Sequence, residues 1–301
     1  MNKQRCAVLL ATFNGKAWVG EQIQSILDQK SIDIDIFICD DISTDETINY
    51  ILENFDDDSR VNIIRNSKKF KCAAKNFYNL ILDSDYSNYD YICFADQDDI
   101  WDKEKIISAT KKICLEGSIA YSSNVIAFWD DRLKTIMIKK SQKQTKLDYF
   151  FEAPGPGCTF VMKRSFFNEF RLFLKENFIV LEGFSAHDWL VYAYARHRGF
   201  NWSIDPKPYM FYRQHSSNQL GINKGLRQAF KRWKAIKNGD YKRDIMILLK
   251  FFDSKSSSLD YLRNENSIIS YIRFIKGFWQ YRRRVKDKFS LLVIIILGHF
   301  K

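Results

Sequence analysis

Three carboxylates stand within four positions at Asp96, Asp98 and Asp99, directly after an apolar run that ends at Ala95. Carboxylates this close repel one another and resist burial, so a cation is the simplest way to hold them together. Mg²⁺ prefers one or two carboxylates together with phosphate oxygens of a substrate, which predicts a divalent metal that carries a diphosphate. A solvated acidic turn is the alternative, because Asp-rich turns commonly follow strands.

Strand-like and helix-like segments alternate along the first hundred residues. Apolar runs predict strands at residues 6–11, 32–39, 61–64 and 91–95. Helical spacing or a capping signature predicts helices at residues 18–27, from 43–46 onward and at 73–82. The alternation predicts an α/β fold with a mostly parallel sheet and helices on both faces. Ligands of such sheets bind at the carboxyl ends of the strands, where polar residues gather at 12–15, 40–41 and 96–99.

The second half of the chain is less regular. Residues 119–129, 160–162 and 209–213 predict further strands, and residues 182–199 contain a helical pattern. The turn before residue 160 contains Gly157, and glycine permits close approach of the backbone to a ligand, although an ordinary strand-entry turn explains it equally well. Neither GxGxxG nor GxxxxGK[ST] is present, which excludes the dinucleotide fingerprint and the P-loop.

The positive charge is concentrated in residues 222–301, which hold 19 Lys and Arg against 6 Asp and Glu, a net charge of +13 against −2 for residues 1–221. Basic and bulky apolar residues are interleaved at 231–234 and 271–288, and an apolar run follows at 289–297. This pattern predicts a helical basic appendage to a domain of residues 1–221, lying in the plane of an anionic membrane. Packing on the domain, an oligomer interface and nucleic-acid binding are the alternatives, and the domain holds no nucleic-acid motif.

Six cysteines are scattered without CxxC or metal-finger spacing, which predicts buried free thiols in a reducing compartment. The apolar run at 6–11 is too short for the core of a signal peptide, and the longest apolar run, at 291–297, is too short to span a membrane. We therefore expect a cytoplasmic protein.

Three motifs occur in the order and spacing of family 2 glycosyltransferases with the GT-A fold, and the chain resembles that family from residue 4 to about residue 221. They are Ala11-Thr12-Phe13-Asn14-Gly15, Cys39-Asp40-Asp41-Ile42-Ser43-Thr44-Asp45 and Phe94-Ala95-Asp96-Gln97-Asp98-Asp99-Ile100-Trp101. Within the family the chain is most similar to bacterial rhamnosyltransferases. That similarity rests on residues 96–101, Gly157-Cys158-Thr159, His187-Asp188-Trp189 and Tyr212-Arg213-Gln214-His215 with Asn218 and Gly221.

The chain departs from the family pattern at three places. Ile42 stands where the family often has glycine, Asp102-Lys103 stands where proline is usual, and residues 69–72 replace a glycine-containing segment. None of these changes removes a catalytic group.

The resemblance implies an inverting, metal-dependent glycosyltransferase that acts in the synthesis of bacterial surface polysaccharide such as O-antigen. The implied donor is dTDP-β-L-rhamnose, and the implied acceptor is a hydroxyl of a lipid-linked saccharide. The resemblance also implies peripheral attachment to the inner face of the cytoplasmic membrane. It does not decide whether the protein forms an oligomer. A UDP-hexose donor is the alternative, as is a non-catalytic protein on the same fold that binds a nucleotide sugar or a membrane.

The resemblance also implies roles for individual residues. Asp188 is the expected general base, and Asp96, Asp98 and His215 are the expected ligands of Mg²⁺ or Mn²⁺. His187, Trp189 and Trp101 are expected near the acceptor or the donor sugar. The residues expected to bind the nucleotide sugar are Ala11, Thr12, Phe13, Asn14, Asp41, Asn76, Asp96, Gln97, Gly157, Cys158 and Thr159.

Overall fold

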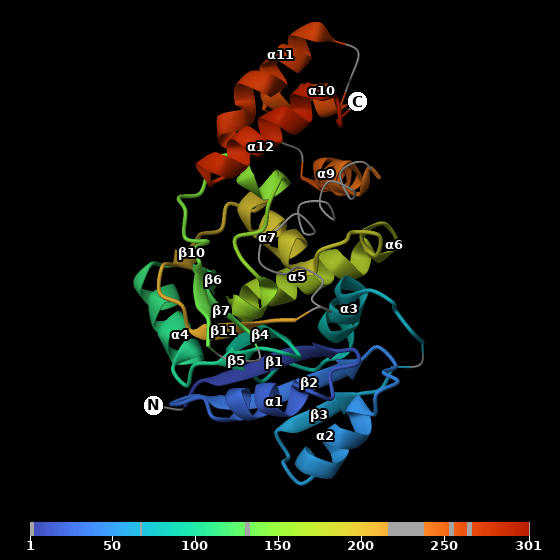
Figure 1. Cartoon of the computed structure of the whole chain (residues 1–301), viewed down its shortest axis with the longest axis vertical. Helices are drawn as coiled ribbons and strands as arrows, with labels where there is room; N and C mark the ends of the chain where they lie inside the picture. Colours follow the sequence, from blue (N-terminus) through green and yellow to red (C-terminus); the bar gives the residue numbers. More distant parts are fainter. Residues whose placement is uncertain are drawn as a thin grey trace. The chain divides into compact units, whose positions relative to one another are not determined.

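The computed structural model describes residues 3–66, 68–129, 133–215, 238–252, 256–263 and 267–300 (Figure 1). The chain forms two compact units. The first comprises Met1–Ser141, Gly155–His187 and Gly199–Gly221, and the second comprises Gln142–Pro154, Asp188–Arg198 and Ile222–Lys301. Two internal segments thus group with the C-terminal region, while a domain boundary at residue 221 stays a prediction. Residues 231–234, Asn218 and Gly221 lie outside the described residues.

A seven-stranded sheet forms the centre of the first unit, in the order β10-β6-β9-β4-β1-β2-β3. Its strands are β1 (Arg5–Thr12), β2 (Asp33–Asp40), β3 (Val61–Ile64), β4 (Tyr91–Asp96), β6 (Ala120–Ser123), β9 (Val161–Lys163) and β10 (Trp202–Asp205). The neighbours from β4 to β3 run parallel, and β9 runs antiparallel between β4 and β6. The mostly parallel α/β sheet is confirmed, and the four strands predicted in the first hundred residues end within one residue of their predicted bounds.

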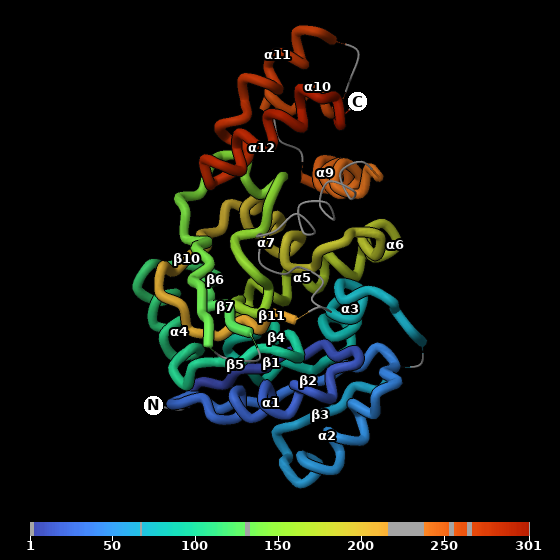
Figure 2. The backbone as a smooth tube through the Cα atoms, viewed as in Figure 1, coloured from blue at the N-terminus to red at the C-terminus, as the bar shows by residue number. Residues whose placement is uncertain are grey.

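Helices cover both faces of this sheet, as Figure 2 shows in the trace of the chain. Cys6, Val8 and Leu10 of β1 pack on the face that also receives Ile23 of α1 and Ile106 of α4. The alternate side chains point to the other face, because successive residues of a strand face opposite sides. There Phe94 of β4 meets Phe77 of α3 at 5.2 Å and Phe167 of α5 at 6.0 Å between ring centroids. The helices of this unit are α1 (Val19–Leu27), α2 (Thr47–Phe55), α3 (Ala73–Asp83), α4 (Lys105–Leu115), α5 (Arg164–Glu176) and α6 (Phe178–Leu181).

The single strand predicted at residues 119–129 is wrong, because the chain changes sheet at Asn124. Residues on either side form β6 and β7 (Val125–Trp129), and β7 joins a second sheet in the order β5-β11-β7-β8. Asn124 turns the chain by accepting bonds at Oδ1 from the amides of Lys140 and Ser141 at 2.6 and 3.0 Å, while its Nδ2 donates to Pro206 O at 2.6 Å. The other strands of this sheet are β5 (Ile100–Trp101), β8 (Thr135–Ile138) and β11 (Met210–Gln214).

The capping signature predicted at residues 43–46 is also corrected. Helix α2 begins at Thr47, and the residue before it, Glu46, has a φ of +65° and makes no side-chain cap. Asp45 provides the cap instead, since its Oδ1 accepts from the amide of Thr47 at 3.1 Å. Ser43 is engaged elsewhere, with Asp40.

The described residues of the second unit are mostly helical. This unit contains α7 (His187–His197, after its first residue), α9 (Asp240–Phe251), α10 (Asp260–Arg263), α11 (Ile268–Lys276), α12 (Val285–Ile296) and the 3-10 helices Asp148–Phe150, Ser257–Leu259 and Gly277–Gln280. Among the described residues, no helix combines the length and the apolar character needed to cross a bilayer.

A buried ionic network ties residues 142–154 to α7 and to the C-terminal region. Asp148, with a fully buried side chain, accepts from Arg196 Nη1 and from Tyr192 OH, both at 2.8 Å. Arg283 donates its backbone amide to Glu152 Oε1 at 2.5 Å and its guanidinium to the carbonyls of Ala153 and Pro154 at 2.7 and 3.1 Å. These bonds explain why residues 142–154 group with the C-terminal helices.

All six cysteines lie in the described ranges and are free thiols. Cys6, Cys39, Cys93 and Cys158 are buried as predicted, whereas Cys114 is exposed near the end of α4. The expectation of burial is wrong for Cys114, because its position falls on the solvent side of the helix.

Candidate active site

The carboxyl ends of β1, β2 and β4 stand side by side. Thr12 lies opposite Asp40 in the β1–β2 register, and Ala11 lies opposite Asp96 in the β1–β4 register. The three polar clusters predicted at the strand ends therefore meet at one edge of the sheet.

Asp40 joins the loops that follow β1 and β2. Its carboxylate accepts from Thr12 Oγ1 at 2.7 Å and from the amide and hydroxyl of Ser43 at 2.7 and 2.6 Å. Ser43 Oγ also accepts from the amide of Asn14 at 2.7 Å, and Asn14 Oδ1 accepts from the amide of Thr44 at 2.8 Å. Thr12 and Asn14 thus shape the loop, and sequence reasoning missed Asp40 as the residue that holds it.

Gln97 pairs with the backbone of Phe13. Its Oε1 accepts from the Phe13 amide at 2.7 Å, and its Nε2 donates to the Phe13 carbonyl at 2.9 Å. Gly15 permits this approach, because a Cβ at that position would lie 2.5 Å from Gln97 Cδ. Gln97 therefore connects the loop after β4 to the loop after β1.

The ring of Phe13 is 43% exposed, next to the end of β1. Lys69 Nζ lies over it at 4.6 Å from the centroid. An exposed aromatic face beside a cation is a suitable surface for a nucleobase with its phosphates. The prediction that Phe13 lines a nucleotide stays open, and Lys69 is a further candidate that the sequence analysis noted only as a departure.

Two of the expected nucleotide-binding residues use their side chains to hydrogen-bond backbone groups of neighbouring loops. The Asp41 carboxylate accepts from the amides of Phe70 and, at 2.8 Å, Lys71, whose φ is +59°. Asn76 Nδ2 donates to the carbonyls of Cys39 and Thr12 at 2.9 and 3.3 Å. Asp41 thus fixes the loop that carries Lys69, and Asn76 fixes the ends of β1 and β2. Their predicted contacts with a nucleotide stay predictions.

Asp98 and His215 form a close pair, with Oδ2 and Nε2 2.7 Å apart and both side chains largely buried. The ring of His215 stacks on Trp18, with centroids 4.0 Å apart. Neighbouring ligands of an octahedral ion with bonds of about 2.1 Å lie about 3 Å apart, so this pair fits a divalent metal after a small opening. Carboxylate and imidazole together suit Mn²⁺ as readily as Mg²⁺.

Asp96, the third expected metal ligand, belongs to a second group. One potential ligand atom from each of Asp96, Asp99 and Cys158 lies within 4.8 Å of the others. Asp99 is fully buried, and its Oδ1 accepts from the amide of Arg213 at 3.2 Å. Burial, and then the Asp98 and Asp96 carboxylates, raise the pKa of Asp99 well above its ordinary value. Burial and the neighbouring carboxylates thus both disfavour the charged form of Asp99.

Arg213 of β11 binds the loop that carries Asp98 and Asp99. Its Nε donates to the carbonyl of Asp98 at 2.9 Å, its Nη2 pairs with Glu21, and its guanidinium lies 4.6 Å from the centroid of the Phe128 ring. Arg213 belongs to the motif at residues 212–215, for which no role was predicted at this position. Arg213 lies two residues before His215, the predicted metal ligand. That position could have indicated a supporting role, because Arg213 anchors the strand that leads to the histidine.

Residues 157–159 form a buried 3-10 turn between Pro156 and β9. The Thr159 hydroxyl and amide donate to the Pro156 carbonyl at 2.7 and 3.0 Å, and burial raises the pKa of the Cys158 thiol. Gly157 and Thr159 are themselves buried. Of this motif, the structure brings Cys158 to the strand-end carboxylates.

Trp101 is a core residue, and its expected place near the acceptor or the donor sugar stays a prediction. Its side chain is 3% exposed, and the ammonium of buried Lys105 lies 3.3 Å from the centroid of its ring. Burial lowers the pKa of Lys105. The Lys105 side chain of α4 therefore covers one face of the indole.

The His-Asp-Trp motif begins α7. His187 stacks on Phe77 with centroids 3.8 Å apart, its Nε2 is buried without a partner, and burial lowers its pKa to about 3. His187 is therefore a neutral packing residue at neutral pH. Asp188, in the first turn of the helix, accepts the amide of Trp189 at 2.8 Å, and the buried Trp189 indole donates to Tyr149 O at 2.8 Å. Asp188 and Trp189 belong to the second unit.

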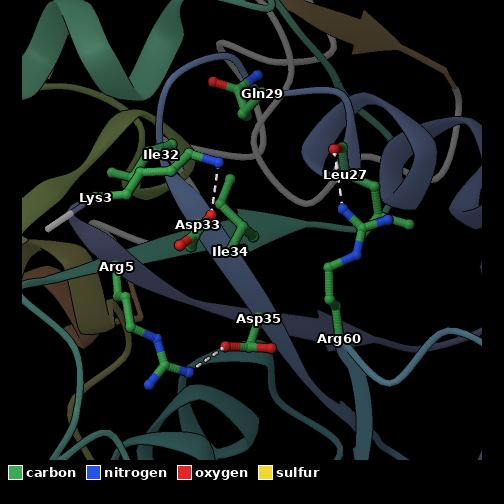
Figure 3. A pocket seen from close by; sticks show the side chains of 9 residues that line it. All are labelled: Lys3, Arg5, Leu27, Gln29, Ile32, Asp33, Ile34, Asp35 and Arg60. Carbon is green, nitrogen blue, oxygen red and sulfur yellow. Dashed lines mark hydrogen bonds and ion pairs between the residues drawn. The ribbon is translucent and has the colours of Figure 1, made fainter.

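A hollow of about 350 Å³ lies at the amino ends of β1 and β2, shown in Figure 3. Its charged side chains pair with one another, as in Lys3 with Asp33 at 2.6 Å and Arg5 with Asp35 at 3.0 Å. Arg60, which also lines the hollow, pairs with Asp58. The hollow lies at the amino ends of the strands, opposite the carboxylates. We therefore do not assign it to the site.

Comparison with known proteins identifies the family. Residues 7–171 match the family model described as glycosyl transferase family 2. A dTDP-rhamnosyl transferase named RfbG from Shigella flexneri is 42% identical over 295 residues, which is 97% of this chain and 100% of that protein. A UDP-Glc:alpha-D-GlcNAc-diphosphoundecaprenol beta-1,3-glucosyltransferase named WfaP from Escherichia coli is 36% identical over 101 residues, 33% of this chain and 38% of that protein.

Solved structures share the fold. TarS from S. aureus, residues 1–349 in complex with UDP-GlcNAc, aligns with a TM-score of 0.56 at 15% identity over 99% of this chain and 88% of that one. The mannosyltransferase PcManGT from Pyrobaculum calidifontis, in complex with GDP-Man and Mn²⁺, aligns with a TM-score of 0.56 at 12% identity over 99% of this chain and 87% of that one. The predicted GT-A fold is confirmed, and the chain is a glycosyltransferase that belongs to glycosyl transferase family 2.

Proposed function

We propose that this enzyme transfers L-rhamnose from dTDP-β-L-rhamnose to a hydroxyl of a lipid-linked saccharide during synthesis of a bacterial surface polysaccharide. The observation that carries the donor is the 42% identity to the protein named dTDP-rhamnosyl transferase RfbG. That likeness spans 97% of this chain and all of the relative, so it includes the residues of both units. A lipid-linked acceptor presents its saccharide at a membrane, so we expect peripheral attachment to the cytoplasmic face.

The strand ends supply the proposed donor site. The base stacks on the exposed ring of Phe13, over which Lys69 lies. The N–H of the base donates to the Asp41 carboxylate, which still has lone pairs available beside its bonds to the backbone. Gln97 keeps Phe13 in place through two hydrogen bonds. Asp96, at the end of β4, faces the ribose and the diphosphate.

The proposed metal ligands are Asp98 and His215, whose facing atoms are 2.7 Å apart and would open slightly to hold one divalent ion. When bound there, Mg²⁺ or Mn²⁺ would neutralise the charge that grows on the leaving diphosphate. Arg213 holds the Asp98 carbonyl and so sets the direction of the carboxylate. The role of Asp96 is then with the nucleotide sugar, beside the buried Asp99.

Asp188 is the proposed general base. It would accept the proton of the acceptor hydroxyl as that oxygen bonds to the anomeric carbon and the bond from this carbon to the diphosphate oxygen breaks. A single displacement of this kind inverts the anomeric centre, so a β-linked donor gives an α-rhamnoside. The Trp189 amide, which donates to Asp188 Oδ1 at 2.8 Å, orients the carboxylate.

A UDP-hexose donor is the second candidate. It is favoured by the relatives WfaP and WfgD from Escherichia coli, both named UDP-Glc-dependent glucosyltransferases, at 36% and 26% identity. Those matches cover 33% and 56% of this chain, so they support the donor less strongly than the match along the whole chain does.

Calorimetric titration of the full chain with dTDP-β-L-rhamnose, UDP-glucose and UDP-GlcNAc tests the donor. We expect dTDP-rhamnose to bind in the presence of Mg²⁺ or Mn²⁺ and to bind more weakly in EDTA. Binding of a UDP-sugar without binding of dTDP-rhamnose would exclude the proposed donor. Binding of dTDP-rhamnose without turnover on any lipid-linked saccharide would favour a non-catalytic protein.

A further inference from the structure

Helix α12 is apolar on two opposite sides. Leu291 and Ile295 are each 1% exposed and pack into the second unit. Val285, Phe289, Val293 and Ile296 are 49–58% exposed. At about 100° per residue these four fall within a sector of about 80° on the far side of the helix from the buried pair. The core of the unit therefore accounts for one side of α12 and leaves the other unexplained.

Helix α11 repeats the pattern and lies against α12, where Tyr271 OH donates to Ile295 O at 3.2 Å. Its Phe274 is fully buried, whereas Ile268, Ile269 and Ile272 are 78%, 64% and 45% exposed. Between the helices, Trp279 is 49% exposed and its ring meets that of Phe289 at 5.6 Å. We call the exposed set the apolar face: Ile268, Ile269, Ile272, Trp279, Val285, Phe289, Val293 and Ile296. Single exposed apolar residues are ordinary, but eight on two helices that contact each other indicate an interaction surface.

Basic side chains are exposed on the same two helices. Arg273 and Lys276 of α11 and Arg284 and Lys286 at the start of α12 are exposed. Lys288 Nζ lies over the exposed ring of Trp279 at 5.1 Å. Residues 268–296 contain one acidic residue, Asp287. The surface is thus both apolar and strongly positive.

The charge selects the occupant. A second copy seated on this face would bring one set of exposed arginines and lysines against another, and like charges brought together at an interface cost affinity. An anionic lipid surface attracts the same residues and accepts the apolar side chains at its headgroup boundary. Helix α12 has 12 residues, a length of about 18 Å, which is too short to cross a hydrocarbon layer of about 30 Å.

We propose that the apolar face docks on an anionic bilayer, with α12 lying in the plane of the interface and the basic residues among the lipid headgroups. This proposal deepens the proposed function and rests on it, because docking would bring the enzyme to the membrane where a lipid-linked acceptor lies. The binding itself depends only on the second unit. It therefore holds or fails separately from the choice of donor.

Co-sedimentation of the full chain with vesicles tests the proposal. The vesicles are phosphatidylcholine alone and phosphatidylcholine with phosphatidylglycerol. The apolar variant is Phe289→Asp with Val293→Asp, and we expect its partition onto anionic vesicles to fall at least about tenfold. The charge variant is Arg284→Glu with Lys286→Glu. We expect its partition onto anionic vesicles to fall roughly fivefold for each residue changed, and its partition onto neutral vesicles to stay the same. Added salt should reduce the difference between this variant and the unaltered chain.

The matched control is Leu172→Asp on α5 of the first unit, because Leu172 is 59% exposed and Ile296 of the apolar face is 58% exposed. This control should bind vesicles like the unaltered chain. Thermal unfolding and dTDP-rhamnose binding are measured for every variant, so that loss of vesicle binding by a folded variant is separated from unfolding. Brominated lipid should quench the fluorescence of Trp279. We therefore expect stronger quenching of the unaltered chain than of Trp279→Phe.

Equal binding of all variants to anionic vesicles, or equal binding to neutral and anionic vesicles, would overturn the proposal. So would a dimer, seen by sedimentation equilibrium, that Phe289→Asp dissociates, because a second copy would then occupy the face. Vesicle binding that follows our expectation while dTDP-rhamnose fails to bind would refute the proposed donor and leave the docking surface standing.

Discussion

Replacing Gly15 by alanine tests whether the loops at the strand ends form one preorganised donor site. The new Cβ would lie 2.5 Å from Gln97 Cδ, closer than two carbon atoms can approach without bonding. Gln97 cannot simply turn aside, because both ends of its amide are bonded to the Phe13 backbone, at 2.7 and 2.9 Å. We therefore expect Gly15→Ala to displace Gln97 and to break both bonds.

The size of the effect follows from those two bonds. A typical hydrogen bond contributes about 0.5–1.5 kcal/mol net, and these two lie near solvent, so their joint loss costs about 1–2 kcal/mol. If donor binding must restore the arrangement, that cost appears as a dissociation constant for dTDP-rhamnose that rises by about 5- to 30-fold. The rest of the fold should keep its stability within about 0.5 kcal/mol.

Calorimetric titration with dTDP-rhamnose measures the effect, and Gly155→Ala is the matched control. A Cβ at Gly155 meets its nearest atom, Ser123 O, at 3.5 Å, an ordinary contact, so this variant should bind the donor normally. A double-mutant cycle with Gln97→Ala then isolates the clash, because Gly15→Ala should cost less than about 0.5 kcal/mol once the Gln97 side chain is gone. Unchanged donor affinity in Gly15→Ala, or an equal cost in both backgrounds, would refute the reasoning.

Three further outcomes are expected. Asp98→Ala should lower turnover at least about 100-fold with the fold intact, because it removes a proposed metal ligand; full activity of the variant, or of the enzyme in EDTA, contradicts the metal role. Asp188→Asn should bind donor normally and lose transfer, since an amide cannot take the proton; near-normal turnover rejects the assignment. Burial lowers the pKa of His187 to about 3, whereas the unfolded chain protonates it near about 6.5, so the free energy of unfolding should fall by about 2 kcal/mol from pH 7 to pH 5. His187→Phe should lose less in urea unfolding over the same range, and an equal loss would show that other groups cause it.

The periodicity of the first hundred residues predicted that part of the fold well. Strands β1, β2, β3 and β4 are continuous apolar runs that end in polar loops, and runs of this kind mark a buried parallel sheet. Parallel neighbours bring their carboxyl ends together, so Thr12 lies opposite Asp40 and Ala11 lies opposite Asp96. That is why the location of the carboxylate cluster could be predicted without a structure.

The remaining features depend on contacts that sequence patterns do not encode. Asn124 interrupts an apolar run by bonding to residues 16 and 82 positions away, so a strand prediction passes through it. Arg283 binds residues about 130 positions earlier and draws the segment before the 157–159 turn into the second unit. Trp101 was expected near the acceptor or the donor sugar because of its motif. That its ring is buried under Lys105, four residues along the chain, could not be predicted, because buried lysines are rare.

The most direct test is transfer itself. The full chain is incubated with dTDP-β-L-rhamnose, Mn²⁺ and lipid-linked saccharides extracted from bacterial membranes, and the product is examined by nuclear magnetic resonance. We predict an α-linked rhamnose on the lipid-linked saccharide, absent with Asp98→Ala and with Asp188→Asn. A β-linked product, or consumption of a UDP-hexose in a reaction that leaves dTDP-rhamnose untouched, would contradict it.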